Sequence, residues 1–319
     1  MDLAQASAAY RGELLAHCYR MLGSLNDAED LVQETMLRAW RFAGGYDESR
    51  GSVRTWLYRI ATNACLSYLE GRQRRAMPVD LNGPSQPPDI EKIEQHLEIP
   101  WLEPFPDALV SSADPSAVVE VRESIRLAFI AALQHLPPRQ RAVLILRDVL
   151  GMPAAEAASL LEMTVASVNS ALQRARAQLA AAAPSADGVG LVQPSDDTSR
   201  DLLDRYTAAF TAMDVEALKA TLREDALLQM PPFPQWFLGR DAIGEFMTTA
   251  FARGGSYRFV QTLANGQPAM GLYRRRDSDA YQFLHIQVLT MSQTGITQID
   301  GFHVHGLSTR FGLPAALQD

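Results

Sequence analysis

An apolar periodicity between residues 155 and 180 constrains this chain more than any other feature of its sequence. The spacings of three, four and seven residues are those of helices with one buried face, and they are set by Ala158, Leu161, Val165, Val168, Leu172 and Leu179. The triplet Glu162-Met163-Thr164 interrupts the period, and a threonine at that point can cap a following helix. The pattern therefore predicts two helices joined by a short turn.

The outer side of the second predicted helix carries short polar side chains and two arginines: Ser167, Asn169, Ser170, Gln173, Arg174 and Arg176. Short polar groups can reach base edges or phosphates in a DNA groove, and arginine neutralises phosphate or binds guanine bidentately. The solvated face of an ordinary helical hairpin has the same composition. The pattern alone leaves both interpretations open.

Two prolines upstream sharpen the choice. Pro137 and Pro138 end one predicted helix and preset the first turn of the next. The run LPPRQRAVLILRDVLGMPAAEAASLLEMTVASVNSALQRARAQL resembles region 4 of bacterial sigma-70-type factors of the extracytoplasmic-function (ECF) group. The resemblance implies that residues 120–183 form a helix-turn-helix domain that binds the −35 promoter element. The family often has Lys where this chain has Asn169, so the promoter sequence stays open.

The whole chain has the length and composition of a globular protein with two or three domains. It has 319 residues, of which 47% are hydrophobic and 21% charged. Cys18 and Cys65 lie in apolar helical patterns without metal-ligand spacing, which indicates buried thiols in a reducing compartment. No charged leader precedes an apolar core, and no apolar run approaches the ~18 residues of a membrane span. We expect a cytoplasmic protein without membrane contact, metal or cofactor.

The net charge of −8 is unevenly distributed. The two candidate DNA-binding stretches are weakly basic, at +1 for residues 1–76 and +2 for 120–183, whereas 77–119 carry −7 and 184–319 carry −4. Non-specific DNA affinity scales with the phosphates neutralised. Weak basic character suits a protein that a larger partner delivers to DNA.

Two amphipathic helices are predicted near the N-terminus, one from Tyr10 to Gly23 and one that begins at a cap, Asn26 or Asp27, and ends at Trp40. The polar side of the second helix is by itself an ordinary solvated face. However, DAEDLVQETMLRAW resembles region 2.2 of the same sigma family. The resemblance implies that this helix docks on the β′ clamp helices of RNA polymerase through Asp30, Gln33 and Glu34.

A third helix is predicted from Val53 to Gly71, after a glycine-bounded loop that can hold a flipped base. RTWLYRIATNACLSYL resembles regions 2.3 and 2.4, which hold the −10 element as a single strand. Single-strand capture needs aromatic faces beside cationic groups. The resulting candidates are Arg54, Tyr58, Arg59, Asn63, Arg72, Arg74 and Arg75. Trp56 is expected in the core rather than as a stacking platform.

Two linkers are predicted. Residues 77–119 are acidic and proline-rich, with a short helix and an extended anchor at Trp101 and Phe105. Their first half is either a disordered tether or, as the resemblance implies, a segment that threads the polymerase cleft. Residues 184–197 form the second linker, rich in Ala, Pro, Ser and Gly.

Residues 198–319 change in character. Helical patterns come first, and alternating segments follow over 257–263, 269–275, 281–291 and 296–304. This order predicts an α+β domain with a curved antiparallel sheet. LREDALLQMPPFPQWFLGRDAIGEFM and IDGFHV resemble the SnoaL-like branch of the NTF2-like superfamily. The predicted fold is therefore multidomain, with two all-α sigma domains (a region 2 helical bundle and a region 4 helix-turn-helix) and an α+β cone domain.

Alternation on the segment 281–291 places polar groups on an apolar wall, as a small-molecule pocket requires. The candidate ligand pocket comprises Trp236, Phe283, His285, Gln287, Asp300 and His303. Asp300 or His285 could serve an enzyme as acid or base. Alternatively, His285 is a satisfied core histidine and Asp300 an edge residue, so no catalytic residue is assigned.

The sequence thus predicts an ECF sigma factor and not an enzyme. Residues 7–76 would bind core RNA polymerase and the −10 strand, and residues 120–183 the −35 duplex. The implied partners are the β′ clamp helices and β flap of core RNA polymerase and promoter DNA. Residues 198–319 would regulate the sigma domains in cis by intramolecular contact. The alternatives are a small-molecule sensor, or a polyketide-cyclase-like or isomerase-like enzyme fused to a DNA-binding unit.

Overall fold

The computed structural model describes residues 9–47, 51–85, 93–110, 121–182, 197–276 and 279–318. Contacts divide the chain into two compact units. One unit joins Met1–Arg75 to Leu109–Ser185, and the other joins Ala76–Ala108 to Ala186–Asp319. The chain therefore passes between the units three times.

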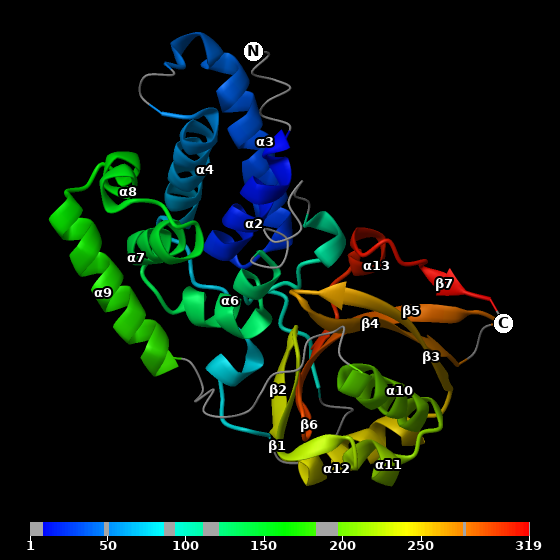
Figure 1. Cartoon of the computed structure of the whole chain (residues 1–319). Helices are drawn as coiled ribbons and strands as arrows, with labels where there is room; N and C mark the ends of the chain where they lie inside the picture. Colours follow the sequence, from blue (N-terminus) through cyan, green and yellow to red (C-terminus); the bar gives the residue numbers. More distant parts are fainter. Residues whose placement is uncertain are drawn as a thin grey trace. The chain divides into compact units, whose positions relative to one another are not determined.

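Helices α2, α3 and α4 pack together in the N-terminal stretch of the first unit (Figure 1). They span Arg11–Leu22, Leu25–Arg41 and Val53–Leu69, and the short helix η1 covers Ala43–Gly45. The hydroxyl of Ser24 accepts a hydrogen bond from the amide of Asp27 at 3.2 Å and caps α3. The predicted cap at Asn26 or Asp27 is therefore wrong, because the helix begins earlier, directly after the left-handed Gly23 that ends α2.

Apolar side chains of these three helices form a buried core, and one polar pair lies within it. Leu14, Val32 and Leu57 are fully buried. His17 Nε2 lies 2.9 Å from the hydroxyl oxygen of Thr62. Burial lowers the pKa of His17 to about 3, so its ring is neutral at physiological pH.

The second stretch of the first unit is also helical. Its elements are α6 Leu127–Gln134, α7 Pro138–Leu144, the π-helical continuation Ile145–Val149, α8 Ala154–Leu161 and α9 Val165–Ala182. Glu162 takes a left-handed conformation with φ of 55° and ends α8. The hydroxyl of Thr164 accepts a hydrogen bond from the amide of Ser167 at 3.1 Å, which confirms the predicted cap of α9.

Two buried arginines join the halves of the first unit. Arg141 donates to the carbonyl oxygens of Met21 and Leu136 and, twice, to Gln134. Arg20 donates to the hydroxyl of Ser124 at 2.6 Å. Because both guanidinium groups leave water, their hydrogen bonds compensate a large desolvation cost and fix α2 against α6 and α7.

The second unit contains a curved sheet with strand order β2-β1-β6-β5-β4-β3, and β7 pairs with β5. The strands are β1 Leu222–Met230, β2 Phe233–Leu238, β3 Ser256–Ala264, β4 Gln267–Arg275, β5 Tyr281–Ser292, β6 Gly295–Phe302 and β7 Ala316–Leu317. All strand pairs are antiparallel except β1 with β6. The predicted α+β class is confirmed, although β1 and β2 were not predicted.

Helices α10, α11 and α12 lie together on the concave side of this sheet (Figure 1). They span Asp197–Thr211, Val215–Lys219 and Arg240–Ala252, and a short α13 covers Leu307–Arg310. Phe210 contacts the rings of Phe251 and Tyr257 edge to face, with centroids 5.1 and 5.3 Å apart. Such aromatic contacts tie the helices to the open end of the cone.

The stretch 76–108 packs within the second unit, although it was predicted as part of a linker. Ala76 pairs with Trp101, and Pro106 pairs with Ala264 of β3. Its short helices are η3 Pro78–Asp80 and η5 Asp107–Leu109. Trp101 and Phe105 are buried, as expected for the predicted anchor, but the described residues 93–98 form no helix.

Candidate functional site

The outer face of α9 presents every side chain predicted to contact the −35 duplex. Val168, Ala171, Leu172 and Ala175 face inward, and an exposed row is formed by Ser167, Asn169, Ser170, Gln173, Arg174 and Arg176. The Thr164 cap fixes where this helix begins. The row therefore has the polarity and length of a helix face that fits the major groove.

The two arginines of this row differ in their surroundings. Arg176 makes a bidentate ion pair with Asp148, with N–O distances of 2.8 and 2.7 Å, and this hydrogen bonding raises the pKa of Arg176. Within the described part of the chain, Arg174 has no ion-pair partner. Arg174 is thus the better placed of the two to neutralise a phosphate or bind a base.

Tyr58, predicted to contact the −10 strand, is buried instead. It is 1% exposed, its ring lies edge to face with His17, and its hydroxyl donates to Glu13 at 3.3 Å. Burial raises its pKa. Trp56 is more exposed than predicted. It was expected in the core but is half-buried against Tyr46. α4 is covered on more than one side, so a single helical period misassigns both residues.

Two of the predicted −10 residues of α4 make contacts within the first unit. Arg54 forms an ion pair with Glu13 at 2.8 Å. Arg59 donates to the carbonyl oxygen of Ser159 in α8 at 2.6 Å. Beside it, the hydroxyl of Thr55 donates to Glu156 at 2.6 Å. In this arrangement, α8 occupies part of the α4 face that was predicted to hold single-stranded DNA.

The remaining −10 candidates lie within α4 or just after its end. Asn63 is exposed. Arg72 stacks over the ring of Tyr68 with its guanidinium carbon 3.8 Å from the ring centroid. Arg74 lies 3.0 Å from the ring of His135, and Arg75 pairs with Asp27. Each of these three arginines therefore contacts a side chain of the first unit.

The predicted polymerase-binding residues Asp30, Gln33 and Glu34 share one face of α3, where Glu34 pairs with Arg38. Two apolar side chains continue the same face at helical spacing. Leu37 is 50% exposed and Trp40 is 73% exposed. Sequence reasoning missed them as contact residues, although their spacing of four and seven residues from Gln33 would have identified them. Large exposed apolar groups on a polar helix indicate a protein interface.

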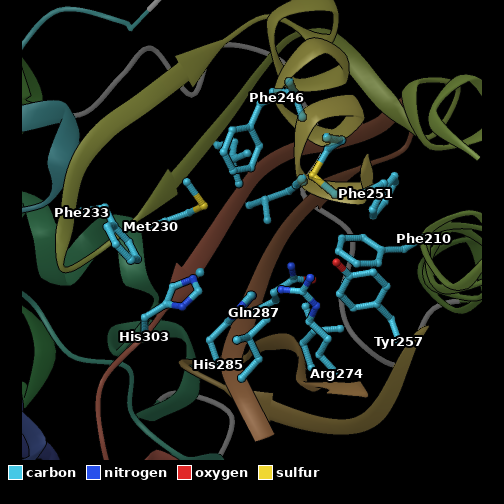
Figure 2. A pocket seen from close by; sticks show the side chains of 18 of the residues that line it. Phe210, Met230, Phe233, Phe246, Phe251, Tyr257, Arg274, His285, Gln287 and His303 are labelled. Atoms are coloured by element: carbon cyan, nitrogen blue, oxygen red, sulfur yellow. The ribbon is translucent and has the colours of Figure 1, made fainter. Parts of the chain in front are cut away.

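A cavity of about 350 Å³ lies between the sheet and helices α10–α12 (Figure 2). One wall is apolar and is formed largely by Phe210, Leu218, Ile243, Phe246, Met247 and Phe251. The sheet side contributes polar side chains to the lining, namely Arg274 of β4, His285 and Gln287 of β5 and His303, which follows β6. This volume falls in the range of small-molecule sites, which is roughly 300–1,000 Å³. A mostly apolar lining with a few polar side chains is also typical of such sites.

Three of the six predicted pocket residues line this cavity, namely His285, Gln287 and His303. Phe283 does not. The register of β5 on β4 shifts so that Leu272 opposes His285 and Tyr273 opposes Phe283, and this bulge sends the ring of Phe283 to the other face, against Tyr273.

Trp236 and Asp300 also lie outside the cavity. The indole Nε1 of Trp236 donates to the carbonyl oxygen of Asn82 at 2.8 Å. Asp300 is fully buried on the far side of β6 and accepts hydrogen bonds from Gln229 at 2.7 Å and from Gln298 at 2.9 Å. Burial raises the pKa of Asp300 to about 6, and these hydrogen bonds oppose the shift.

The stretch 76–108 reaches the cavity. Ile93 and Gln95 lie in its lining. Nearby, the amide of His96 donates to the carbonyl oxygen of Pro232 at 2.9 Å, and the amide of Ser85 donates to that of Trp236 at 2.8 Å. The segment is thus hydrogen-bonded to β2 and to the residue before it, and it contributes side chains to a site built mainly by the C-terminal domain.

Neither a membrane helix nor a metal cluster emerges from the described residues. Their helices are too short or too polar to cross a bilayer. They also contain no group of three His, Cys, Asp or Glu side chains arranged to hold a metal ion.

The helix-turn-helix with its polar α9 face, the α2–α4 bundle and the cone domain together define a promoter-recognition protein fused to an NTF2-like domain. Family models agree with this class: Sigma-70 region 2 matches residues 7–75, Sigma-70 region 4 matches 126–179, and the SnoaL-like domain matches 203–299. The chain belongs to the ECF RNA polymerase sigma factors. Membership in this family makes it a transcription factor.

Relatives match this chain over nearly its whole length, across all three domains. The chain is 47% identical over 319 residues to the ECF RNA polymerase sigma factor SigG of Mycobacterium tuberculosis, with 99% of this chain and 85% of SigG covered. It is 26% identical to SigJ of the same organism, covering 98% of this chain and 89% of SigJ. The crystal structure of SigJ matches with a TM-score of 0.64 at 22% identity, over 98% of this chain and 100% of that chain. That likeness establishes the fold.

Proposed function

We propose that this chain binds core RNA polymerase through residues 7–76 and reads promoters with two surfaces. The exposed face of α9 contacts the −35 duplex within residues 120–183. Once α8 has left the face of α4, the cations around α4, Arg54, Arg59, Arg72, Arg74 and Arg75, together with Asn63, contact the −10 strand. The α3 face of Asp30, Gln33 and Glu34 meets the β′ clamp helices, and region 4 meets the β flap.

The observation that carries this proposal is the capped α9 helix with six exposed polar side chains on one face. The test is transcription in vitro with purified core RNA polymerase on a genomic promoter library. We expect promoter-specific transcripts that depend on this protein and that are lost in the double variant Asn169→Ala, Arg174→Ala. Arg205→Ala, an exposed arginine of α10, is the control. Absence of specific transcripts from the folded wild-type protein would reject the proposal.

We further propose that residues 198–319 regulate the sigma domains in cis by holding the segment 76–108. Support comes from its buried anchor, in which Trp101, Leu102 and Phe105 are shielded from water. A segment held in this way is withheld from the polymerase cleft. Phe105→Ala should release the segment and raise transcription from a cognate promoter, whereas the exposed Leu97→Ala should not. Equal transcription by all three proteins would contradict cis regulation.

The cavity supports a second role, binding of a small molecule as a sensor. Its enclosed apolar wall and buried histidines favour this role. An isomerase-like or cyclase-like activity has less support, because Asp300 faces away from the cavity and burial lowers the pKa of the lining histidines His285 and His303, which makes them weak bases. Catalysis of proton transfer needs an acid or base within hydrogen-bonding reach of the substrate.

A further inference from the structure

Among the residues that the structure describes, three buried side-chain nitrogen atoms without a hydrogen-bond partner belong to residues that line this one cavity. They are Nδ1 of His285, Nε2 of His303 and Nε of Arg274. Figure 2 shows Arg274 beside Phe210 and Tyr257 and His303 on the side of Met230 and Phe233, with His285 between these two groups. Buried polar atoms are nearly always satisfied, so three such atoms around one space indicate a missing hydrogen-bonding group.

The charges of the lining side chains indicate which chemical group of a ligand would fit this cavity. Arg253 and Arg274 are both in the lining, and no Asp or Glu of the described chain joins them there. The Nη2 atom of Arg274 already donates to the carbonyl oxygen of Gly254 at 2.7 Å, which holds the guanidinium in place. Since the described lining offers this fixed guanidinium no carboxylate, it favours an oxyanion ligand, which it would bind through charge-assisted hydrogen bonds.

The histidines add polarity without charge. Their ring centroids lie 4.0 Å apart, and burial lowers the pKa of His303 to about 4 and that of His285 well below its ordinary value. Each neutral ring offers one donor and one acceptor. The pair can therefore bond a hydroxyl or carbonyl oxygen of a ligand, while the facing wall of Phe246, Met247 and Phe251 accepts an apolar body.

We propose that the cavity binds an apolar carboxylic acid whose carboxylate meets Arg274, and that Ile93 and Gln95 complete the site so that occupancy stabilises the docked segment 76–108. The regulatory half of this proposal, stabilisation of the docked segment, rests on the proposed cis control. The binding half, recognition of the acid by the cavity, is independent of it. Because both residues of the segment share the cavity lining with Arg274, a bound acid adds contacts that exist only while the segment is docked.

The binding half is tested with cis-parinaric acid, a fluorescent apolar acid, titrated into the full-length protein beside its neutral methyl ester. We expect saturable binding, with the acid at least tenfold tighter than the ester. Arg274→Met should abolish that preference, and Arg274→Lys should retain part of it. Arg275→Met is the matched control, because Arg275 stacks over Tyr281 outside the cavity. Thermal melting of each variant verifies folding.

Equal affinity for the acid and the ester, or an acid preference that survives in Arg274→Met, would overturn the proposal. So would undiminished binding in Ala250→Trp, which fills the cavity from α12. The regulatory half is read by hydrogen exchange over residues 93–108, where the acid should slow exchange. Binding without slower exchange would reject the coupling alone. Because neither readout uses RNA polymerase, failure of the sigma function would be seen separately, in transcription.

Discussion

Asn265 and Phe105 exchange two hydrogen bonds. The amide of Phe105 donates to the side-chain oxygen of Asn265 at 2.8 Å, and the amide of Asn265 donates to the carbonyl oxygen of Phe105 at 2.9 Å. Asn265 begins the Asn-Gly turn between β3 and β4 with φ of 56°, a left-handed conformation that asparagine tolerates. This turn residue therefore binds the C-terminal end of the segment 76–108 to the sheet through two hydrogen bonds, in addition to the contacts of the segment with β2 and β3.

Asn265→Gly should loosen this attachment without disturbing the turn, because glycine accepts a positive φ but offers no side-chain oxygen. Loss of one hydrogen bond of about 1 kcal/mol predicts roughly fivefold faster exchange of the Phe105 amide. Hydrogen exchange with mass spectrometry measures it. Unchanged exchange of the Phe105 amide in Asn265→Gly would show that this contact does not hold the segment.

Arg174→Ala should weaken binding to a −35 duplex more than Arg176→Ala, because Arg176 is already paired with Asp148. We expect Arg174→Ala to cost about 1–3 kcal/mol if Arg174 binds a base, or to reduce the salt slope by about 1 if it binds a phosphate. Fluorescence anisotropy at several salt concentrations distinguishes the two. The reverse ranking of the two variants would contradict the assignment of the α9 face.

Arg141→Met should destabilise the first unit strongly, since it leaves the carbonyl oxygens of Met21, Gln134 and Leu136 without this donor. Burial already lowers the pKa of Arg141 to about 10, which reflects the cost of holding this charge away from water. Unpaired buried acceptors cost about 1–3 kcal/mol each. Denaturant unfolding of the full-length protein measures the loss. Arg139→Met, exposed on the same helix, is the control and should unfold like the wild type.

Asp300→Asn should stabilise the second unit at pH 7.5. The pKa of Asp300 is raised from 3.8 to about 6, so ionisation costs the folded state roughly 3 kcal/mol once pH exceeds both values. Wild-type stability contributed by the neutral acid is complete below pH 4 and is lost as pH rises through 6. Asparagine can still accept the bonds from Gln229 and Gln298. Melting curves from pH 4 to 7.5 should therefore lose this decline in the variant.

Trp40→Ala should reduce affinity for core RNA polymerase and leave folding intact, because its side chain is 73% exposed. Tryptophan is enriched among interface hot spots, whose truncation to alanine costs about 2 kcal/mol or more. Affinity can be measured by biolayer interferometry with immobilised core enzyme. Leu238→Ala, an exposed apolar residue of β2, provides the comparison. If both variants bind as tightly as the wild type, the apolar end of α3 lies outside the interface.

Local patterns predicted the parts of this protein that depend on one helix or strand. Thr164 and the period of Val168 and Leu172 define α9, and alternation along β5 placed His285 and Gln287 on one wall. The strand β2 was missed because its Pro234 resembles a loop residue. The sheet tolerates this proline because β2 is an edge strand.

Features that depend on packing between distant stretches escaped prediction. The bulge beside Phe283 follows from the pairing of β5 with β4, which no local period records. Burial of Tyr58 follows from contacts of α4 with α2 and with the region 4 helices. Docking of the segment 76–108 depends on Asn265 and Trp236, more than 100 residues away in sequence. Proline content and acidity gave no sign of these partners.

The chain crosses between its two units three times. Deleting its C-terminal residues therefore does not remove one unit as a whole. A chain that ends before residue 198 keeps the segment 76–108 but loses the surface that covers it. Leu102 and Phe105, now without any exposure, would face water beside Trp101, and such a patch invites self-association. Loss of activity in a truncated protein would then result from self-association rather than from the loss of a regulatory domain.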